Sequence, residues 1–530
     1  MRSFELPGRS PVHAMRGMAA TSHPLASLTA IEVLKTGGNA IDAAVAACAV
    51  LGVVEPQSTG IGGDCFAMFS PAGSQKVIAY NGSGRAPAIV NLEGLNRQGI
   101  FEIEQHSAHA VTIPGAVDAW ARLVSDYGRK SLGELLAPAI KLAAEGYPIH
   151  ARIAHDWQRT QDTLKTDPNT ASIFLPNGKV PDIGSVHRQP QLAQTLAHIA
   201  KVGRDGFYEG WVAADIVSHL KRRGGLHSME DFASAQGEYV QPIQTVYRGC
   251  SLYECPPNGQ GLTALILLNI LSGFDLDQMH PLSTDRLHLE IEAAKLAYQD
   301  RNTYIGDPAQ SRIPVDQLLS EAHATAMREA IDMNRTLDQV PSLQLPSHAD
   351  TVCLSVVDQD RNAVSFINSL FHAFGSGLTA SRSGVLLQSR GVAFSLEADH
   401  PNCIAPGKRP LHTIIPAMVC KDDKPIMPFG VMGGQYQAMG HAHFLCNCID
   451  YKLDIQESID LGRVFPLPDG TVEVESSIPA EAVAGLRERD HHICSPEIPL
   501  GGAQAIWIDW DTGVLTGGSD ARKDGCALGY

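Results

Sequence analysis

The stretch "SHADTVCLSVVDQDRNAVSFIN" at 347–368 decides the fold, because a strand pattern begins inside it directly after an irregular run. Residues 335–350, "RTLDQVPSLQLPSHAD", contain two prolines and little periodicity, which predicts an exposed linker. From Thr351 onward, "TVCLSVVD", the turn signal "QDRN" and "AVSFINSLF" predict a β-hairpin. In its first strand, Thr351, Cys353 and Ser355 share one face, while Val352, Leu354 and Val356 share the other.

Thr351 lies where a hydroxyl side chain could cut its own chain. Its Oγ could attack the carbonyl of Asp350, and hydrolysis of the resulting ester would leave Thr351 as a new N-terminus. The freed α-amine, with an ordinary pKa of about 7.7–8.0, could then act as the base for the same residue's hydroxyl. Threonine also begins many ordinary strands, because β-branched residues fit pleated surfaces. On this pattern alone both interpretations stay open.

The composition is typical of a globular protein and restricts the class of partner. The chain has 530 residues, 44% hydrophobic and 18% charged, enough for two to four domains or one large unit. A net charge of −16 without a basic cluster argues against nucleic acid, since phosphate binding needs concentrated positive charge. The N-terminus has no apolar signal core, and the most apolar stretch, 40–54, is too short to span a bilayer. We therefore expect a cytoplasmic protein without a membrane partner.

The cysteines and histidines do not predict a metal site. The eleven cysteines are scattered without a CxxC motif, which is typical of reduced, mostly buried thiols. His441, His443, Cys446 and Cys448 match no standard zinc spacing and predict core packing beside a helix. We expect neither a metal nor a cofactor.

Helical and strand patterns divide the chain near residue 350. Helices are expected at 26–36 and 40–54, within 115–145, 190–225 and 260–300, and near 440–450, and strands at 384–388, 414–420 and 504–508. The glycine turn "GIGGD" at 60–64 follows a helix and precedes a strand. A dinucleotide site needs the opposite order, so this turn does not indicate one.

Seven motifs in one order resemble the gamma-glutamyltranspeptidase (glutathione hydrolase) family. They are "GGNAIDAAVAACAVLGVVEPQSTGIGGDCF", "VTIPGAVDAW", "PPNGQG", "DTVCLSVVDQDRNAVSF", "APGKRPLHTIIPA", "GVMGGQYQ" and "GGSDARKDGCALGY". The resemblance implies an N-terminal-nucleophile hydrolase of α+β class, a four-layer αββα sandwich of two chains cut from one precursor. The cut falls at Asp350–Thr351, so that 1–350 form a large subunit and 351–530 a small one within one integrated unit. It also allows a homodimer of processed heterodimers.

The resemblance assigns roles to four residues. Thr351 falls on the family's nucleophile, and Ser369 falls on a second hydroxyl that assists processing and activity. Gly433 and Gly434 fall on the pair whose N–H groups form the oxyanion hole. Fixed N–H donors stabilise charge that develops only in the transition state, which gives this role a physical basis.

The chain departs from the family where a glutamyl group would bind. The position of the family's carboxylate-binding arginine falls near Ser83, and Arg85 lies two positions away. The family also binds this carboxylate with a pair of serines, and His412 and Thr413 stand in their place. The ligands of the substrate's α-amine are replaced by Phe371, Arg390 and Ala393. The candidate substrate-binding residues are therefore Arg390, His412, Thr413 and Arg85.

Arg390 has two interpretations. A guanidinium repels an ammonium group and favours a carboxylate or carbonyl, whereas an ordinary structural ion pair would also explain an arginine here.

The motifs together predict a self-processing threonine amidohydrolase or acyltransferase acting on a small-molecule amide. Gamma-glutamyl compounds are the family's usual substrates. A small non-glutamyl amide such as oxamate is the alternative, since the chain is similar to the transpeptidase-like branch that includes oxamate amidohydrolase. An unprocessed relative acting as a binding protein is a third hypothesis.

Overall fold

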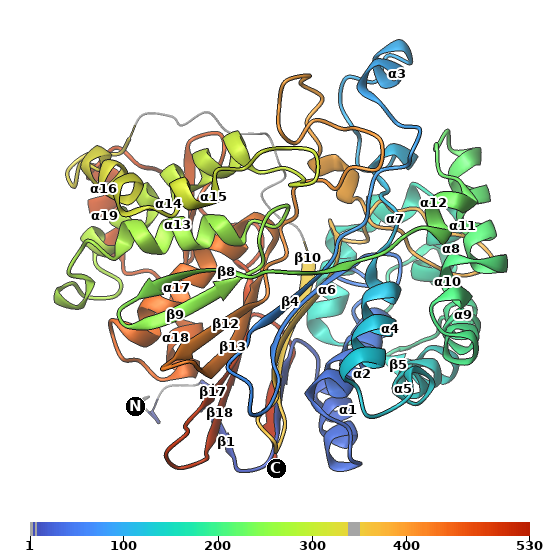
Figure 1. Cartoon of the computed structure of the whole chain (residues 1–530), viewed down its shortest axis with the longest axis horizontal. Helices are drawn as coiled ribbons and strands as arrows, with labels where there is room; N and C mark the ends of the chain where they lie inside the picture. Colours follow the sequence, from blue (N-terminus) through green and yellow to red (C-terminus); the bar gives the residue numbers. More distant parts are fainter. Residues whose placement is uncertain (1–3, 6–7, 338–349) are drawn as a thin grey trace.

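Two large antiparallel sheets form the centre of the molecule. The computed structural model describes residues 4–5, 8–337 and 350–530. In Figure 1 the strands run through the middle, with α13, α14, α17 and α18 on one side and α1, α2, α4, α5 and α9 on the other. Residues 338–349, most of the predicted linker, lie outside the described part of the chain.

The predicted hairpin is confirmed and occupies the middle of one sheet. Strands β10 (Asp350–Val357) and β11 (Ala363–Phe371) pair antiparallel, with Val356 opposite Val364. The strand order is β19-β2-β10-β11-β3-β4-β7. The other strands of this sheet are β2 (Met18–Thr21), β3 (Asp64–Ser70), β4 (Ile78–Gly82), β7 (Glu238–Val240) and β19 (Cys526–Gly529).

The second sheet has the order β1-β18-β17-β13-β12-β9-β8. Its strands are β1 (Val12–Ala14), β8 (Ile243–Tyr247), β9 (Cys250–Glu254), β12 (Ala417–Lys421), β13 (Lys424–Met432), β17 (Gly502–Ile508) and β18 (Leu515–Ser519). Both sheets therefore contain strands from before and after Asp350–Thr351. The division into two chains at that point stays a prediction.

The faces of β10 sort as the alternation predicts. Cys353 lies in an apolar cluster between the sheets with Phe66 and Met418, and the Ser355 hydroxyl donates to the carbonyl of Gln504 on β17 at 3.1 Å. Val352, Leu354 and Val356 belong to a different cluster, formed with the helices. Each face of the hairpin thus packs against its own layer.

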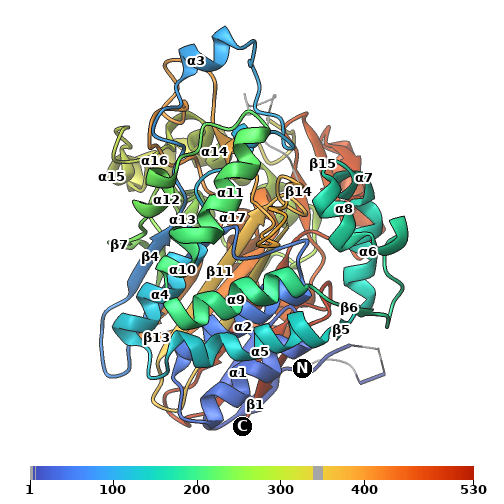
Figure 2. The ribbon, with the colours of Figure 1, turned by 90° about the vertical axis from the view of Figure 1, so that its right-hand side faces the viewer.

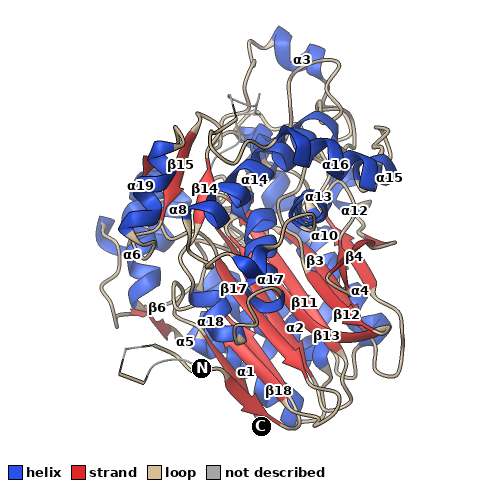
Figure 3. Cartoon of the chain, turned by 90° about the vertical axis from the view of Figure 1, so that its left-hand side faces the viewer, coloured by secondary structure: helices blue, strands red, loops and turns tan. Residues whose placement is uncertain are grey.

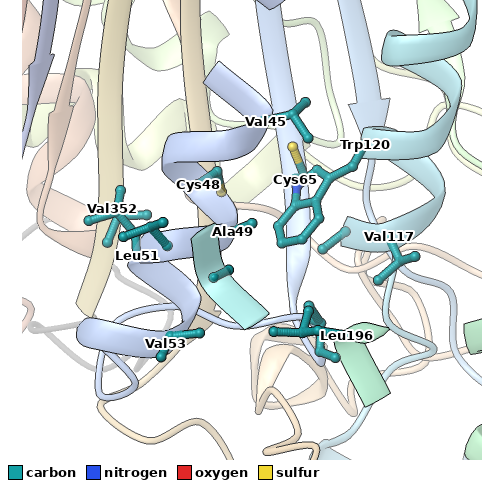
Figure 4. Packing of buried hydrophobic residues seen from close by; sticks show 14 of the residues in the cluster. Val45, Cys48, Ala49, Leu51, Val53, Cys65, Val117, Trp120, Leu196 and Val352 are labelled. Carbon is teal, nitrogen blue, oxygen red and sulfur yellow. The ribbon is translucent and has the colours of Figure 1, made fainter. Parts of the chain in front are cut away.

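Helices cover the outer face of the hairpin's sheet (Figure 2). Helices α1 (Pro24–Lys35), α2 (Ala40–Val54) and α4 (Ala116–Tyr127) contact the sheet, α5 (Leu132–Glu145) packs on α2, and α9 (Pro190–Val202) packs on α5. Every residue of α2 is buried, and its small side chains permit close packing against Cys65, Trp120 and Val352 (Figure 4). Asn39 is the N-cap of this helix and forms a capping box with Asp42.

The other sheet is covered by α13 (Gly261–Leu271), α14 (Thr284–Tyr304), α17 (Gln437–Ile449) and α18 (Ile455–Asp460), seen in Figure 3. The remaining helices are α3 (Leu92–Arg97), α6 (Ala151–Arg159), α7 (Gln161–Lys165), α8 (Pro168–Phe174), α10 (Asp205–Tyr208), α11 (Gly210–Arg222), α12 (Met229–Ala233), α15 (Val315–Leu318), α16 (Glu321–Ala330) and α19 (Ala480–Glu488). Small peripheral sheets contain β5 (Tyr147–Pro148), β6 (Val186–His187), β14 (Val464–Pro466), β15 (Thr471–Val474) and β16 (His492–Cys494).

Most predicted elements are confirmed, with one clear exception. The predicted helices at 26–36, 40–54 and near 440–450 correspond to α1, α2 and α17. The predicted strand at 384–388 is wrong, because Leu386 and Leu387 make only isolated bridges to Thr379 and Gly62. Hydrogen bonds to turns and loops fix this segment, and they take the place of a continuous β-ladder. One of them runs from Gln388 N to Gly62 O at 3.0 Å.

Two further features bear on the predictions from composition. None of the helices in the described ranges is long and apolar enough to cross a membrane. All eleven cysteines are free, and most of them are buried, as expected. The cytoplasmic location stays a prediction.

The glycine turn before β3 has a packing function that can be tested. A Cβ on Gly63 would lie 2.2 Å from the carbonyl oxygen of Ser369, whereas a Cβ on Gly60 would make only ordinary contacts at 3.9 Å. We expect Gly63→Ala to lower the free energy of unfolding by about 1–3 kcal/mol, since overpacking forces the backbone apart. Gly60→Ala is the matched control and should change it by less than about 1 kcal/mol. Denaturant unfolding measures both, and equal effects would contradict the packing argument.

Candidate active site

Thr351 is the second residue of β10 and contacts a second hydroxyl on the neighbouring strand. Its side chain is buried, and its Oγ1 lies 3.0 Å from Ser369 Oγ. A register shift between Asp350 and Val352 sets this end of the hairpin. The backbone N–H of Phe371 donates to the same Ser369 oxygen at 2.9 Å. The structure therefore brings together the two hydroxyls singled out by sequence.

Gly433 lies in the same cavity as Thr351. The cavity is lined by Arg152, Thr351, Met432, Gly433, Tyr436, Ile498, Pro499, Leu500, Gly501 and Lys523. Gly433 has a φ of +124° and Gly434 a φ of +57°, directly after β13 ends. A Cβ on Gly433 would lie 2.7 Å from Gly501 Cα, so both conformation and space require glycine.

A buried glutamine holds the glycine turn in place. Gln260 Nε2 donates to the carbonyl of Gly434 and to that of Thr413, each at 2.9 Å. The Gln260 oxygen accepts a hydrogen bond from Arg301 Nη1 at 2.9 Å. Burial lowers the pKa of Arg301 to about 10, so this donor stays charged at neutral pH. The "PPNGQG" motif contains Gln260, but nothing local in the sequence indicates this contact.

Arg390 lies directly behind the pair of hydroxyls. It begins a short 3₁₀ turn and is fully buried. Its Nη1 donates to Thr413 Oγ1 at 2.9 Å, and its Nη2 lies 3.4 Å from Ser369 Oγ. Its guanidinium carbon lies 4.2 Å from the centre of the Phe371 ring, a cation–π contact. Three of the predicted site residues, Arg390, Thr413 and Ser369, are therefore in contact with one another through the Arg390 guanidinium.

No carboxylate within the described residues forms an ion pair with Arg390, and its Nε has no hydrogen-bond partner among them. Burial lowers the pKa of Arg390 to about 9, while the charge of Asp64 acts in the opposite direction. The guanidinium therefore remains charged at neutral pH. The structural ion pair considered from the sequence is not formed by the described part of the chain.

Phe371 adopts a backbone conformation that is unusual for its type. Its φ is +79°, in the left-handed region, where a bulky side chain costs about 1–2 kcal/mol. The residue is fully buried at the end of β11. Its ring contacts the Arg390 guanidinium, and its N–H donates to Ser369 Oγ. This backbone conformation allows both contacts.

Asp64 is a central residue of the site that sequence reasoning missed. It pairs with Ser369 across β3 and β11, and it is fully buried. Its carboxylate accepts hydrogen bonds from Gly115 N at 3.1 Å, Gln388 Nε2 at 2.9 Å and His412 Nε2 at 3.1 Å. An acidic residue directly after a glycine turn, at the head of an apolar strand, was the signal that could have indicated it.

His412 supports Asp64 as a neutral side chain. Burial, followed by the charge of Arg390, lowers the pKa of His412 to about 4. Its Nδ1 accepts from Ile414 N at 3.3 Å, which leaves the proton on Nε2 to donate to Asp64. Thr413, the next residue, contacts Arg390 directly. Thr413 therefore contacts the Arg390 cation, and His412 contacts the Asp64 carboxylate.

Arg85 lies elsewhere in the network. Its Nη1 contacts Asp307 at 3.4 Å and the carbonyl of Gly407 at 3.1 Å. Its contacts within the described residues include none of Thr351, Ser369 and Arg390. The sequence proximity of Arg85 to the family's arginine position does not translate into a contact with the hydroxyl pair.

One cluster in the described ranges has ligand types suited to a metal. His288, Glu292 and His491 are buried, and their ligand atoms lie within 4.8 Å of one another. A hydrogen bond joins the two histidines, since His288 Nδ1 lies 2.8 Å from His491 Nε2, while Glu292 accepts a hydrogen bond from Lys295 at 2.8 Å. None of the three lines the cavity at Thr351.

The histidines and cysteines of α17 are likewise divided among separate partners. His441 contacts Glu254 at 2.6 Å, His443 contacts Glu290 at 3.0 Å, and Cys446 Sγ lies 3.3 Å from the Tyr247 hydroxyl. These contacts explain the three side chains as core packing.

Comparison with known proteins gives this geometry its context. The family model described as gamma-glutamyltranspeptidase matches residues 26–530. The chain belongs to the gamma-glutamyltranspeptidase family. It is accordingly a hydrolase.

Members of the gamma-glutamyltranspeptidase family that are named for different activities resemble this chain. It is 38% identical over 520 residues to the glutathione hydrolase-like YwrD proenzyme of Bacillus subtilis strain 168, covering 97% of this chain and 98% of that protein. It is 33% identical to the oxamate amidohydrolase proenzyme of Klebsiella pneumoniae, over 97% of this chain and 98% of that one. The crystal structure of cephalosporin acylase from Bacillus halodurans matches with a TM-score of 0.94 and 40% identity, covering 100% of this chain and 99% of that chain. The family is thus established, while its members differ in substrate.

The buried carboxylate of Asp64 yields a stability prediction. Asp64→Asn removes the charge that accepts three hydrogen bonds and that faces the Arg390 cation. We expect the free energy of unfolding to fall by about 3 kcal/mol, because a buried charge loses its compensation. The matched control is Asp360→Asn, which removes an exposed ion pair with Arg129 and should cost less than about 1 kcal/mol. Chemical denaturation measures both, and a stable Asp64→Asn protein would contradict the assigned role.

Proposed function

We propose that this chain is a precursor that cuts itself at Asp350–Thr351 and then hydrolyses amides through an ester on Thr351. The observation that carries the proposal is the contact of Thr351 Oγ1 with Ser369 Oγ at 3.0 Å, in the cavity that also contains Gly433. Related members of the family that are proenzymes support the precursor. The four-layer αββα sandwich of the N-terminal-nucleophile hydrolases, with a 1–350 and a 351–530 chain, belongs to the same proposal.

Self-cleavage begins with an N-to-O shift. The Thr351 hydroxyl attacks the carbonyl carbon of Asp350, the peptide C–N bond breaks, and the acyl group passes to Oγ. Water then hydrolyses the ester, leaving a carboxylate on Asp350 and a free α-amine on Thr351. Ser369, which contacts the attacking oxygen, orients it and shares its proton.

Hydrolysis of an external amide repeats the chemistry with the freed amine as base. Thr351 Oγ attacks the substrate's carbonyl, and the N–H groups of Gly433 and Gly434 stabilise the oxyanion. The amine leaves with a proton, and water or a second amine takes the acyl group from Oγ. The left-handed glycines support this role, because they turn the backbone sharply beside the nucleophile.

The surroundings of Thr351 favour a substrate without an α-ammonium group. An ammonium needs carboxylate or amide acceptors, and Phe371 and Ala393 offer none. The nearby carboxylate of Asp64 is already bonded to three donors. A small non-glutamyl amide therefore fits the site better than a gamma-glutamyl compound.

The nucleophile itself provides the first test. Wild-type protein should separate into two chains, the smaller beginning at Thr351, whereas Thr351→Ala should remain a single chain of 530 residues. Thr351→Ser is the matched control and should still be cut, because it keeps the hydroxyl. Intact mass and N-terminal sequencing measure the products. An uncut wild-type chain after prolonged incubation would overturn self-processing.

The oxyanion role of Gly433 gives a second test. Gly433→Ala meets both a φ of +124° and a contact at 2.7 Å, and should lower kcat by about 100-fold or more with any amide that the wild type hydrolyses. Gly73→Ala is the matched control, since Gly73 has a φ of +69° in open space. It should lose only about 1–2 kcal/mol of stability and keep its activity. Unchanged turnover in Gly433→Ala would remove this residue from the oxyanion site.

A further inference from the structure

His288, Glu292 and His491 bring three possible metal-ligand atoms together in the interior. His288 and Glu292 lie four residues apart in α14, so they share one face of that helix. His491 lies between α19 and β16, 203 positions from His288 along the chain. All three residues are buried, and their ligand atoms lie within 4.8 Å of one another. Because packing alone brings the third ligand to the other two, no spacing motif in the sequence indicates the cluster.

The separations between these atoms suit a tetrahedral ion of the size of Zn²⁺. Ligands that each lie about 2.0–2.1 Å from Zn²⁺ are about 3.3 Å apart at the tetrahedral angle. His288 Nδ1 lies 2.8 Å from His491 Nε2, which in turn lies 3.9 Å from Glu292 Oε1. These two distances fall on either side of the ideal value, so small side-chain rotations make room for the ion. Two imidazoles and one carboxylate form a ligand set of Zn²⁺ that leaves a fourth position for water.

The hydrogen bonds of the two rings allow both ligand nitrogens to offer a lone pair. His288 Nε2 lies 2.9 Å from the carbonyl oxygen of Asp332, so in the neutral ring the proton is on Nε2 and Nδ1 is bare. Such a carbonyl partner is typical of metal-bound histidines. His491 Nδ1 has no hydrogen-bond partner among the described residues, so no contact there fixes which nitrogen of this ring holds the proton. An ion can therefore replace the proton between the two rings, and that proton passes to His491 Nδ1.

We infer that His288, Glu292 and His491 form a binding site for a divalent cation of the zinc class. None of the three lines the cavity at Thr351, so the site is separate from the proposed chemistry. The inference replaces the expectation, drawn from spacing along the chain, that no metal binds. The ion joins α14, in the 1–350 part, to His491, in the 351–530 part. If the chain is cut at Asp350–Thr351, the ion links two chains; this consequence alone rests on the proposed function.

Lys295 competes with the ion for the carboxylate. Its Nζ donates to Glu292 Oε1 at 2.8 Å, and the hydroxyl of Thr336 donates to the same oxygen at 3.0 Å. The backbone N–H of Leu337 donates to the other oxygen at 2.6 Å. A cation on Oε1 repels the ammonium, so the two cannot both bind there. The Lys295 side chain is 14% exposed and also contacts Thr336, so its ammonium has somewhere to go when the ion binds.

An open groove of about 500 Å³ lies next to this cluster. Its lining includes Thr284, one helical turn before His288, and Arg489, two residues before His491. Asp285 and Glu488 also line it, and Arg489 forms an ion pair with Asp285. Glu488 therefore leaves the groove with a net negative charge, which favours the approach of a cation.

Titration of the full chain with metal alone tests the site. The protein is treated with EDTA, dialysed, and titrated with Zn²⁺ by calorimetry and with Co²⁺ by absorption, at about pH 7.5, where an ordinary imidazole with a pKa of about 6.5 is mostly neutral. We expect a single tight site whose Co²⁺ complex shows visible d–d bands without a thiolate charge-transfer band. Thr351→Ala should bind equally well, because the ligands do not depend on processing. Lack of a tight site, or a thiolate band from any of the eleven free cysteines, would overturn the inference.

Variants assign the binding to these side chains. His288→Gln and His491→Gln should each weaken Zn²⁺ binding by more than about 100-fold, since even an outer-shell partner contributes about 10–100-fold. His492→Gln removes the exposed neighbouring histidine, is the matched control, and should bind as wild type does. Lys295→Met should strengthen binding by about 10-fold, because it removes a charged hydrogen bond that competes with the ion. Unchanged affinity in both histidine variants, or weaker binding in Lys295→Met, would contradict the site.

Thermal unfolding and N-terminal sequencing separate this site from the proposed function. The Tm of wild type should rise with Zn²⁺ concentration and that of His491→Gln should not, while unfolding in EDTA shows that each variant is folded. Where a histidine variant does not fold, the wild-type Co²⁺ spectrum and Lys295→Met decide the question. A protein that is cut at Thr351 but has no tight site refutes the cation site and leaves the threonine hydrolase standing. An uncut protein that binds Zn²⁺ as expected refutes self-processing and leaves the cation site standing.

Discussion

The antiparallel pairing of β10 with β11, continued by β3, is the constraint on which the site depends. Residues at the same end of these three strands are Thr351, Ser369 and Asp64, so two hydroxyls and a buried carboxylate lie side by side. The strand alternation also sends Cys353 toward the second sheet and Val352 toward the helices. A slip of one residue would exchange these faces, so core packing on both sides holds the register and with it the site.

Around this row, glycines and a strained phenylalanine set distances that ordinary backbone would not reach. Gly63 lets its segment approach the Ser369 carbonyl, and Gly433 turns sharply beside Gly501. Phe371 occupies the same left-handed region at a cost of about 1–2 kcal/mol. That cost is offset by a large core, and it places an aromatic face on Arg390.

The charged side chains around Thr351 differ in how far their neighbours compensate them. Asp64 accepts hydrogen bonds from three donors, and His412 is kept neutral by burial. Arg390 keeps its charge, and its Nε has no hydrogen-bond partner among the described residues. An ammonium group brought to this point would therefore meet a cation.

The sequence by itself determined the hairpin that contains Thr351, the helix at 40–54 and the family. These signals are local, since alternation, capping residues and motif spacing depend on neighbours along the chain. It also identified Arg390 as a departure from the family.

Only the tertiary structure decided that Asp64 joins Ser369 and His412, that Gln260 holds the glycine turn, and that Arg85 lies with Asp307. It also decided that 384–388 is no strand and that Arg390 lacks an ion pair in the described chain. Such contacts join residues hundreds of positions apart, so their geometry is set by sheet packing and has no signature in any single stretch of sequence.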